Sequence, residues 1–127
     1  RAKLMLYTAS FYAPDNWVGR PYRVSRQHPR GRPTQWEVLP FLYPALDLLR
    51  AYRSKEIDFA ELSQEYVKGL DEGSSWEGEF RNWVEAVPDL GNFTLLCFEP
   101  AGQDCHRRVL ASWLVQRVPG LELGRLR

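Results

Sequence analysis

The chain has 127 residues, of which 44% are hydrophobic and 26% are charged, a balance typical of one globular domain rather than a disordered chain. No stretch approaches the ~18 consecutive apolar residues that span a bilayer, so we expect no membrane partner. The first ten residues do not form a signal-peptide pattern, because Tyr7 and Thr8 interrupt their apolar run, and a cytoplasmic protein is expected. Two cysteines provide no disulfide framework.

Charge is distributed unevenly along the chain. Residues 1–36 hold seven basic and one acidic residue, residues 37–104 hold five and fourteen, and residues 105–127 hold five and one. Fourteen of the seventeen cations are arginine, whose forked N–H donors bind phosphate and carboxylate. If the two basic ends meet in the fold, they form an electropositive face. The alternative is ordinary surface charge without a ligand.

Residues 3–11 are apolar and aromatic without a helical period, which predicts a buried strand. Turn formers fill residues 13–21, a short strand is predicted for residues 22–26, and residues 28–34 are predicted to form a loop.

Three amphipathic helices are predicted next. The first begins near Pro44, a residue favoured at the first helical position. The second follows Asp58 as N-cap with Glu61 three residues on, and the third begins at Ser74 with Glu77 completing the same capping pattern. The apolar stripes of the second and third helices are assigned to the core: Phe59, Leu62, Tyr66, Leu70, Trp76, Phe80, Trp83, Val84 and Val87.

The C-terminal part is predicted to form a strand at residues 92–98, a loop at 99–104, a helix at 105–118 and a last short strand at 121–123. With the buried strand at the start of the chain, this order predicts one domain over residues 1–127. Its expected class is α/β: a small three-layer fold with a mostly parallel sheet flanked by helices, Rossmann-like or flavodoxin-like.

The segment at residues 95–108, LLCFEPAGQDCHRR, is the most informative one. Open α/β sheets bind ligands outside the carboxyl ends of strands, and a helix N-terminus attracts anions. Arg107 and Arg108 oppose the helix dipole in the first turn, and a bound anion removes that conflict. We therefore predict a phosphate or carboxylate site that includes His106 and Arg107.

Cys105 is predicted near the N-cap of the same helix, where the dipole, His106 and the arginines favour a nucleophilic thiolate. The alternative is a buried packing residue, since the sequence identifies no dedicated base. Glu99 is either a general base or, as we favour, the ion-pair partner of Arg107. Cys97 is assigned to the core of its strand. A metal site from Cys97, Cys105, His106 and His28 matches no zinc spacing, so no metal and no cofactor is predicted.

A second basic cluster occupies residues 25–32. Ser25, Arg26 and Arg30, in a loop stiffened by proline and containing Gly31, have the donors to bind a phosphate. The alternative is an exposed basic loop. Neither a Walker loop nor a dinucleotide fingerprint is present.

These clusters carry a family resemblance. Residues 95–114 resemble the signature of the domain of unknown function 488 family, a strand ending in Leu-Cys, an acidic residue, a short loop, then Cys-His-Arg and a helix. Residues 6–12, 24–31 and 62–71 resemble further segments of one branch, although Gln27-His28 and a longer segment at 42–57 depart from its pattern. The resemblance implies a compact α/β domain and no particular activity. It also implies that these residues gather in one place: Ser25, Arg26, Arg30, Cys97, Glu99, Cys105, His106 and Arg107.

Three functions are compatible with the sequence. The one we predict is the binding of a phosphate-bearing ligand, a nucleotide or a nucleic acid, at a basic crevice. The second is an enzyme on a nucleotide or phosphorylated substrate that uses Cys105 or Glu99. The third is a regulatory module whose acidic middle segment binds a protein partner.

Overall fold

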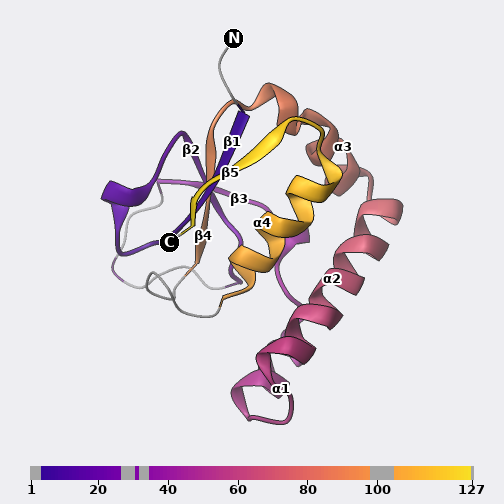
Figure 1. Cartoon of the computed structure of the whole chain (residues 1–127). Helices are drawn as coiled ribbons and strands as arrows, with labels where there is room; N and C mark the ends of the chain where they lie inside the picture. Colours follow the sequence, from indigo (N-terminus) through magenta and orange to yellow (C-terminus); the bar gives the residue numbers. More distant parts are fainter. Residues whose placement is uncertain (1–3, 27–30, 32–34, 98–104, 127) are drawn as a thin grey trace.

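The computed structural model describes residues 4–26, 31, 35–97 and 105–126. Five strands form one sheet: β1 (Leu4–Ser10), β2 (Arg20–Arg23), β3 (Glu37–Val38), β4 (Phe93–Cys97) and β5 (Leu121–Leu126). Their order is β3-β2-β4-β1-β5, and every neighbouring pair is parallel. Figure 1 shows helices α2, α3 and α4 on the same side of the strands. The structure therefore confirms the α/β class and the parallel sheet, and it adds β3, which the sequence did not predict.

Four helices complete the fold: α1 (Leu46–Arg53), α2 (Phe59–Trp76), α3 (Gly78–Ala86) and α4 (His106–Arg117). Three short 3-10 turns, η1 (Pro14–Asn16), η2 (Pro40–Leu42) and η3 (Val87–Asp89), join the larger elements. The predicted cap of α2 is confirmed, since the Asp58 carboxylate accepts a hydrogen bond from the Glu61 N–H at 2.8 Å.

The third helix begins at Gly78, and the predicted start at Ser74 was wrong. Helix α2 continues through Ser74 to Trp76, and the N-cap of α3 is Glu77, which makes no side-chain capping bond. Because the chain turns at Glu77, residues on either side of it belong to two helices and cannot share one stripe. Trp76 is 84% exposed as a result, and its assignment to the core was also wrong.

Hydrophobic residues pack against both faces of the sheet. Residues of α2, α3 and α4 pack with Phe93 and Leu95 of β4 in the larger hydrophobic core. Leu96, whose side chain points to the opposite face of the strand, packs with Phe11 and Trp36 in a second, smaller cluster. The two clusters agree with the predicted three-layer arrangement.

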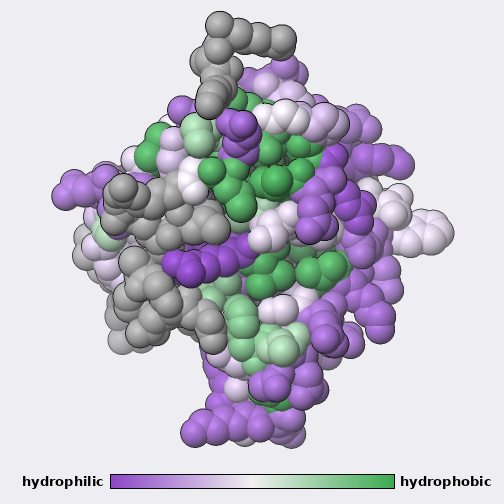
Figure 2. Space-filling view, in the orientation of Figure 1, coloured by the Kyte–Doolittle hydropathy of each residue, from purple (hydrophilic) through white to green (hydrophobic). Residues whose placement is uncertain are grey.

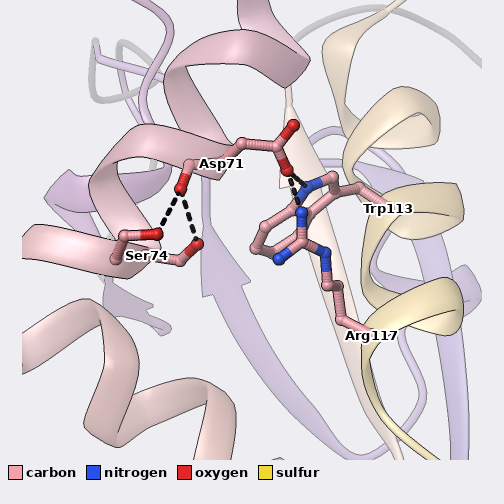
Figure 3. A network of polar contacts seen from close by, with 5 residues as sticks. Asp71, Ser74, Trp113 and Arg117 are labelled. Atoms are coloured by element: carbon pink, nitrogen blue, oxygen red, sulfur yellow. Dashed lines mark hydrogen bonds and ion pairs between the residues drawn. The ribbon is translucent and has the colours of Figure 1, made fainter.

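Helices α2 and α4 are joined by a polar contact at their ends (Figure 3). The Asp71 carboxylate accepts a hydrogen bond from the Trp113 indole N–H at 2.9 Å and pairs with Arg117. The Asp71 backbone carbonyl also accepts from Ser74 Oγ at 3.3 Å, inside α2. The contact joins the C-terminal half of α4 to α2.

On the face shown in Figure 2, hydrophilic residues cover much of the outer edge, and hydrophobic residues lie nearer the middle. Among the described residues, no helix combines the length and the apolar character needed to cross a bilayer.

Candidate functional site

The strand order creates a topological switch point between β2 and β4. These two strands are neighbours, yet the chain runs from β2 to β3 at one edge of the sheet, whereas it runs from β4 through α4 to β5 at the opposite edge. The connections therefore diverge beyond the carboxyl ends of β2 and β4. In open α/β sheets this is where ligands bind. Both predicted clusters follow these two strands.

One hydrogen bond joins the two clusters. His106, the first residue of α4, has its Nε2 at 2.7 Å from the carbonyl oxygen of Val24, the residue next to Ser25. Because a carbonyl oxygen only accepts, Nε2 carries the hydrogen and donates it. In the neutral imidazole, Nδ1 then holds a lone pair.

Two thiols surround that nitrogen. Cys105 is the N-cap of α4, and its Sγ lies 3.8 Å from His106 Nδ1. Cys97 ends β4, and its Sγ lies 3.9 Å from the same atom. Both cysteines are buried and neither is in a disulfide. The sequence predicted Cys97 to be a core residue and identified no base for Cys105, whereas the structure places Cys97 in the cluster and His106 beside both thiols.

Tyr66 of α2 covers the other side of the imidazole. Its ring meets that of His106 edge to face, with centroids 5.4 Å apart. Its hydroxyl donates to the Leu42 carbonyl oxygen at 2.7 Å. Burial, followed by the nearby thiols of Cys105 and Cys97, raises the pKa of Tyr66 well above its ordinary value, so the phenol keeps its proton. The sequence predicted Tyr66 only as a core residue. A hydroxyl on an otherwise apolar stripe could have indicated a polar contact there.

The predicted anion-binding residues differ in their access to solvent. Arg26 is exposed, and its Nε donates to the Pro44 carbonyl oxygen at 2.8 Å. Ser25, His106 and Arg107 are buried, Arg107 completely. Among the predicted cations that the structure describes, Arg26 is therefore the one that a ligand in solution reaches without any rearrangement. His28, Arg30 and Glu99, which the sequence analysis singled out, lie outside the described residues.

A groove of about 310 Å³ adjoins the cluster. Arg26, Tyr43, Glu65, Tyr66 and Glu77 are among the residues that line it. Since Tyr66 lines the groove and also contacts His106, it separates this space from the thiols. The volume lies at the lower end of the roughly 300–1,000 Å³ of small-molecule sites. A larger hollow of about 440 Å³ is lined by residues of α1 and α2 and by Ala45 and Ile57, and it contains none of the predicted site residues.

The cluster has two chemical capabilities. A nitrogen lone pair beside a thiol accepts the thiol proton, the arrangement that activates cysteine nucleophiles. Two thiolates and an imidazole nitrogen are also ligands of soft divalent metals. In both cases the Val24 carbonyl orients the ring, as a third group does in catalytic and metal-bound histidines.

Comparison with known proteins identifies the family. The model of the active DUF488-N3 subclade, DUF488-N3a, matches residues 8–118. Neither the curated proteins nor the solved structures gave a match. The matched region includes β2, β4 and the start of α4, on which the resemblance in the sequence rested. Since it covers well over half of the sequence, the chain belongs to the DUF488 family, the domains of unknown function 488.

Proposed function

We propose that this domain binds a phosphate-bearing ligand, a nucleotide or a nucleic acid, beyond the carboxyl ends of β2 and β4. The observation that carries the proposal is the 2.7 Å hydrogen bond from His106 to Val24. It holds the N-terminus of α4 against the residues that follow β2, at the switch point where such sheets bind ligands.

The charges at this edge favour an anion. The first turn of α4 contains no acidic residue and includes Arg107 and Arg108, so the positive end of the helix dipole and two arginines lie at this turn. Arg26 adds a guanidinium that lines the adjoining groove. Its Nε is engaged with Pro44, and an arginine offers further N–H donors for a phosphate.

A thermal-shift screen of the full chain tests the proposal. The panel contains nucleotides, inorganic phosphate and short single-stranded oligonucleotides. A bound ligand raises the melting temperature, and the rise grows with ligand concentration. Arg26→Ala is expected to abolish the shift, whereas Arg53→Ala, which removes an exposed arginine from α1 outside the groove, is expected to keep it. Arg107→Ala is a poorer test because that side chain is completely buried and its loss also affects folding.

Two results contradict the proposal. One is a panel in which no compound shifts the wild type. The other is a shift that Arg26→Ala and Arg53→Ala both retain in full. For an oligonucleotide, a shift that does not weaken with added salt also argues against contacts with phosphate.

An enzyme on a nucleotide or phosphorylated substrate is the second candidate. The 3.8 Å separation of Cys105 Sγ from His106 Nδ1 favours it, as does the description of the matched subclade as active. Turnover of any ligand found in the screen, lost in Cys105→Ser, supports this candidate. Binding without turnover leaves the domain as a binding module.

The regulatory protein-interaction module stays a prediction from the acidic segment at residues 37–104. A screen without any ligand shift, combined with a salt-sensitive protein partner, favours it over the two functions above.

A further inference from the structure

Three metal-ligating atoms meet at the carboxyl end of β4. Cys97 Sγ, Cys105 Sγ and His106 Nδ1 all lie within 4.8 Å of one another. The three residues are buried, with exposed fractions of 2%, 3% and 7%. These are the atoms through which cysteine and histidine bind soft divalent metals.

The orientation of the imidazole suits a metal ligand. The Nε2–H of His106 donates to the Val24 carbonyl oxygen, which leaves the Nδ1 lone pair directed to the sulfurs. Metal-bound histidines almost always donate their second ring N–H to a carbonyl or carboxylate in this way. The ring is thus already held in the tautomer and orientation that binding requires.

The distances are close to those of a tetrahedral centre. Zinc bonds of about 2.3 Å to sulfur and about 2.0–2.1 Å to nitrogen give edges of about 3.6 Å from sulfur to nitrogen and about 3.8 Å between sulfurs. The two sulfur-to-nitrogen separations are 3.8 and 3.9 Å, and the sulfurs lie no more than 4.8 Å apart. Small side-chain movements therefore bring all three atoms to bonding distance.

The charge of the centre also fits its burial. A divalent ion with two thiolates and a neutral imidazole has no net charge, so the buried site does not need a further counter-ion. The neutral centre also adds no net repulsion to the buried guanidinium of Arg107, the next residue of α4.

We propose that Cys97, Cys105 and His106 form a binding site for a soft divalent metal of the zinc class. Binding displaces one proton from each thiol, so that two sulfur–metal bonds and one nitrogen–metal bond form and two protons enter solution. Within residues 4–26, 31, 35–97 and 105–126 the cluster contributes three ligands. These three ligands leave one position of a tetrahedral centre, the position that water or substrate takes in catalytic zinc sites. The proposal does not depend on the proposed ligand binding, and no phosphate compound enters its test.

Cobalt(II) titration of the reduced, metal-free full chain is the test. We expect one cobalt per chain, d–d absorption typical of tetrahedral coordination, and sulfur-to-metal charge-transfer bands with the intensity of two thiolates. Zinc is expected to displace the cobalt, and two protons are expected to be released per metal bound.

Variants separate a metal site from a merely packed cluster. Cys97→Ser and Cys105→Ser are each expected to halve the charge-transfer intensity and to weaken binding by more than about 100-fold, because even partners outside the coordination shell contribute about 10–100-fold. Ser112→Ala is the control: it changes an exposed side chain of the same helix α4 and removes no ligand, so binding is expected to stay unchanged.

The proposal is overturned if the wild type shows no charge-transfer bands in excess cobalt. It is also overturned if Cys97→Ser binds the metal as tightly as the wild type. Alkylation gives an independent measurement that needs no variant. Zinc is expected to slow alkylation of both cysteines in the native chain, and a Cys105 that reacts equally fast with and without zinc contradicts its role as a ligand.

Discussion

Gly19 lies just before β2, at the amino end of the strand, where β2 begins to pair with β4. Its φ angle is +67°, in the left-handed region. A Cβ added there would lie 1.9 Å from the carbonyl oxygen of Asn92, which accepts the first hydrogen bond of β2 from the Arg20 N–H at 3.1 Å. Gly19→Ala therefore strains the backbone and also forces the Asn92 carbonyl away from Arg20.

Gly91 supplies the matched control. It has a similar φ of +75°, and a Cβ there meets nothing within 4 Å. Gly91→Ala is expected to cost only the left-handed strain, roughly 1–2 kcal/mol. Gly19→Ala adds the loss of a backbone hydrogen bond, about 1 kcal/mol, and the displacement of backbone, for a total of roughly 3 kcal/mol or more.

Urea unfolding followed by tryptophan fluorescence measures both values. We expect a lower urea concentration at the unfolding midpoint for Gly19→Ala than for Gly91→Ala, with the same dependence of the free energy of unfolding on urea concentration. If the two free energies of unfolding agree within about 0.5 kcal/mol, the close approach to Asn92 does not constrain the start of β2, and the reasoning fails.

Three further predictions concern the helices. Phe80→Ala is expected to cost about 3–5 kcal/mol of stability in urea unfolding, because the side chain is 1% exposed, whereas Trp76→Ala, at 84% exposed, is expected to stay within about 0.5 kcal/mol of the wild type. Above about pH 10 the unfolded Tyr66 phenol ionises while the folded one keeps its proton. As the pH rises, the free energy of unfolding is therefore expected to fall by up to about 1.4 kcal/mol per pH unit more in the wild type than in Tyr66→Phe. The same pH dependence in both proteins would contradict the raised pKa. The Asp71–Arg117 pair is half exposed, so a double-mutant cycle with Asp71→Asn and Arg117→Gln is expected to give a coupling below about 1 kcal/mol that disappears at high salt.

Local patterns were sufficient to predict the elements with strong signals. The apolar runs predicted β1 and β4, and Asp58 with Glu61 predicted the start of α2, because these signals depend on neighbours in sequence. Strand β3 has only two residues, and both are exposed, so its sequence carries no apolar pattern. It is a strand because it pairs with β2, a contact that only the folded chain makes.

The sequence placed Cys105 and His106 together in the candidate site, and it did not predict that Cys97 joins them. The rule for parallel sheets located the site after β4 and at the start of α4, where Cys105 and His106 are found. The role of Cys97 required the register of the strand. Its side chain points to the same face as those of Phe93 and Leu95, which α4 covers, and this brings it to His106. The sequence alone does not show how the strands and helices pack, so it does not predict the contact between Cys97 and His106.

Backbone hydrogen bonding explains why the cluster has its chemistry. The Val24 N–H still belongs to the sheet and donates to the Leu96 carbonyl oxygen at 3.2 Å, but β3 pairs only with the two residues before it. The Val24 carbonyl is buried and needs a donor from elsewhere. His106 provides one through Nε2, and the same bond sets the tautomer that turns the Nδ1 lone pair to Cys97 and Cys105. Because the pairing of β2 with β3 ends at Arg23, the Val24 carbonyl takes its hydrogen bond from His106, and Nδ1 is the nitrogen that faces the thiols. This holds whether the thiols bind a metal or react with a substrate.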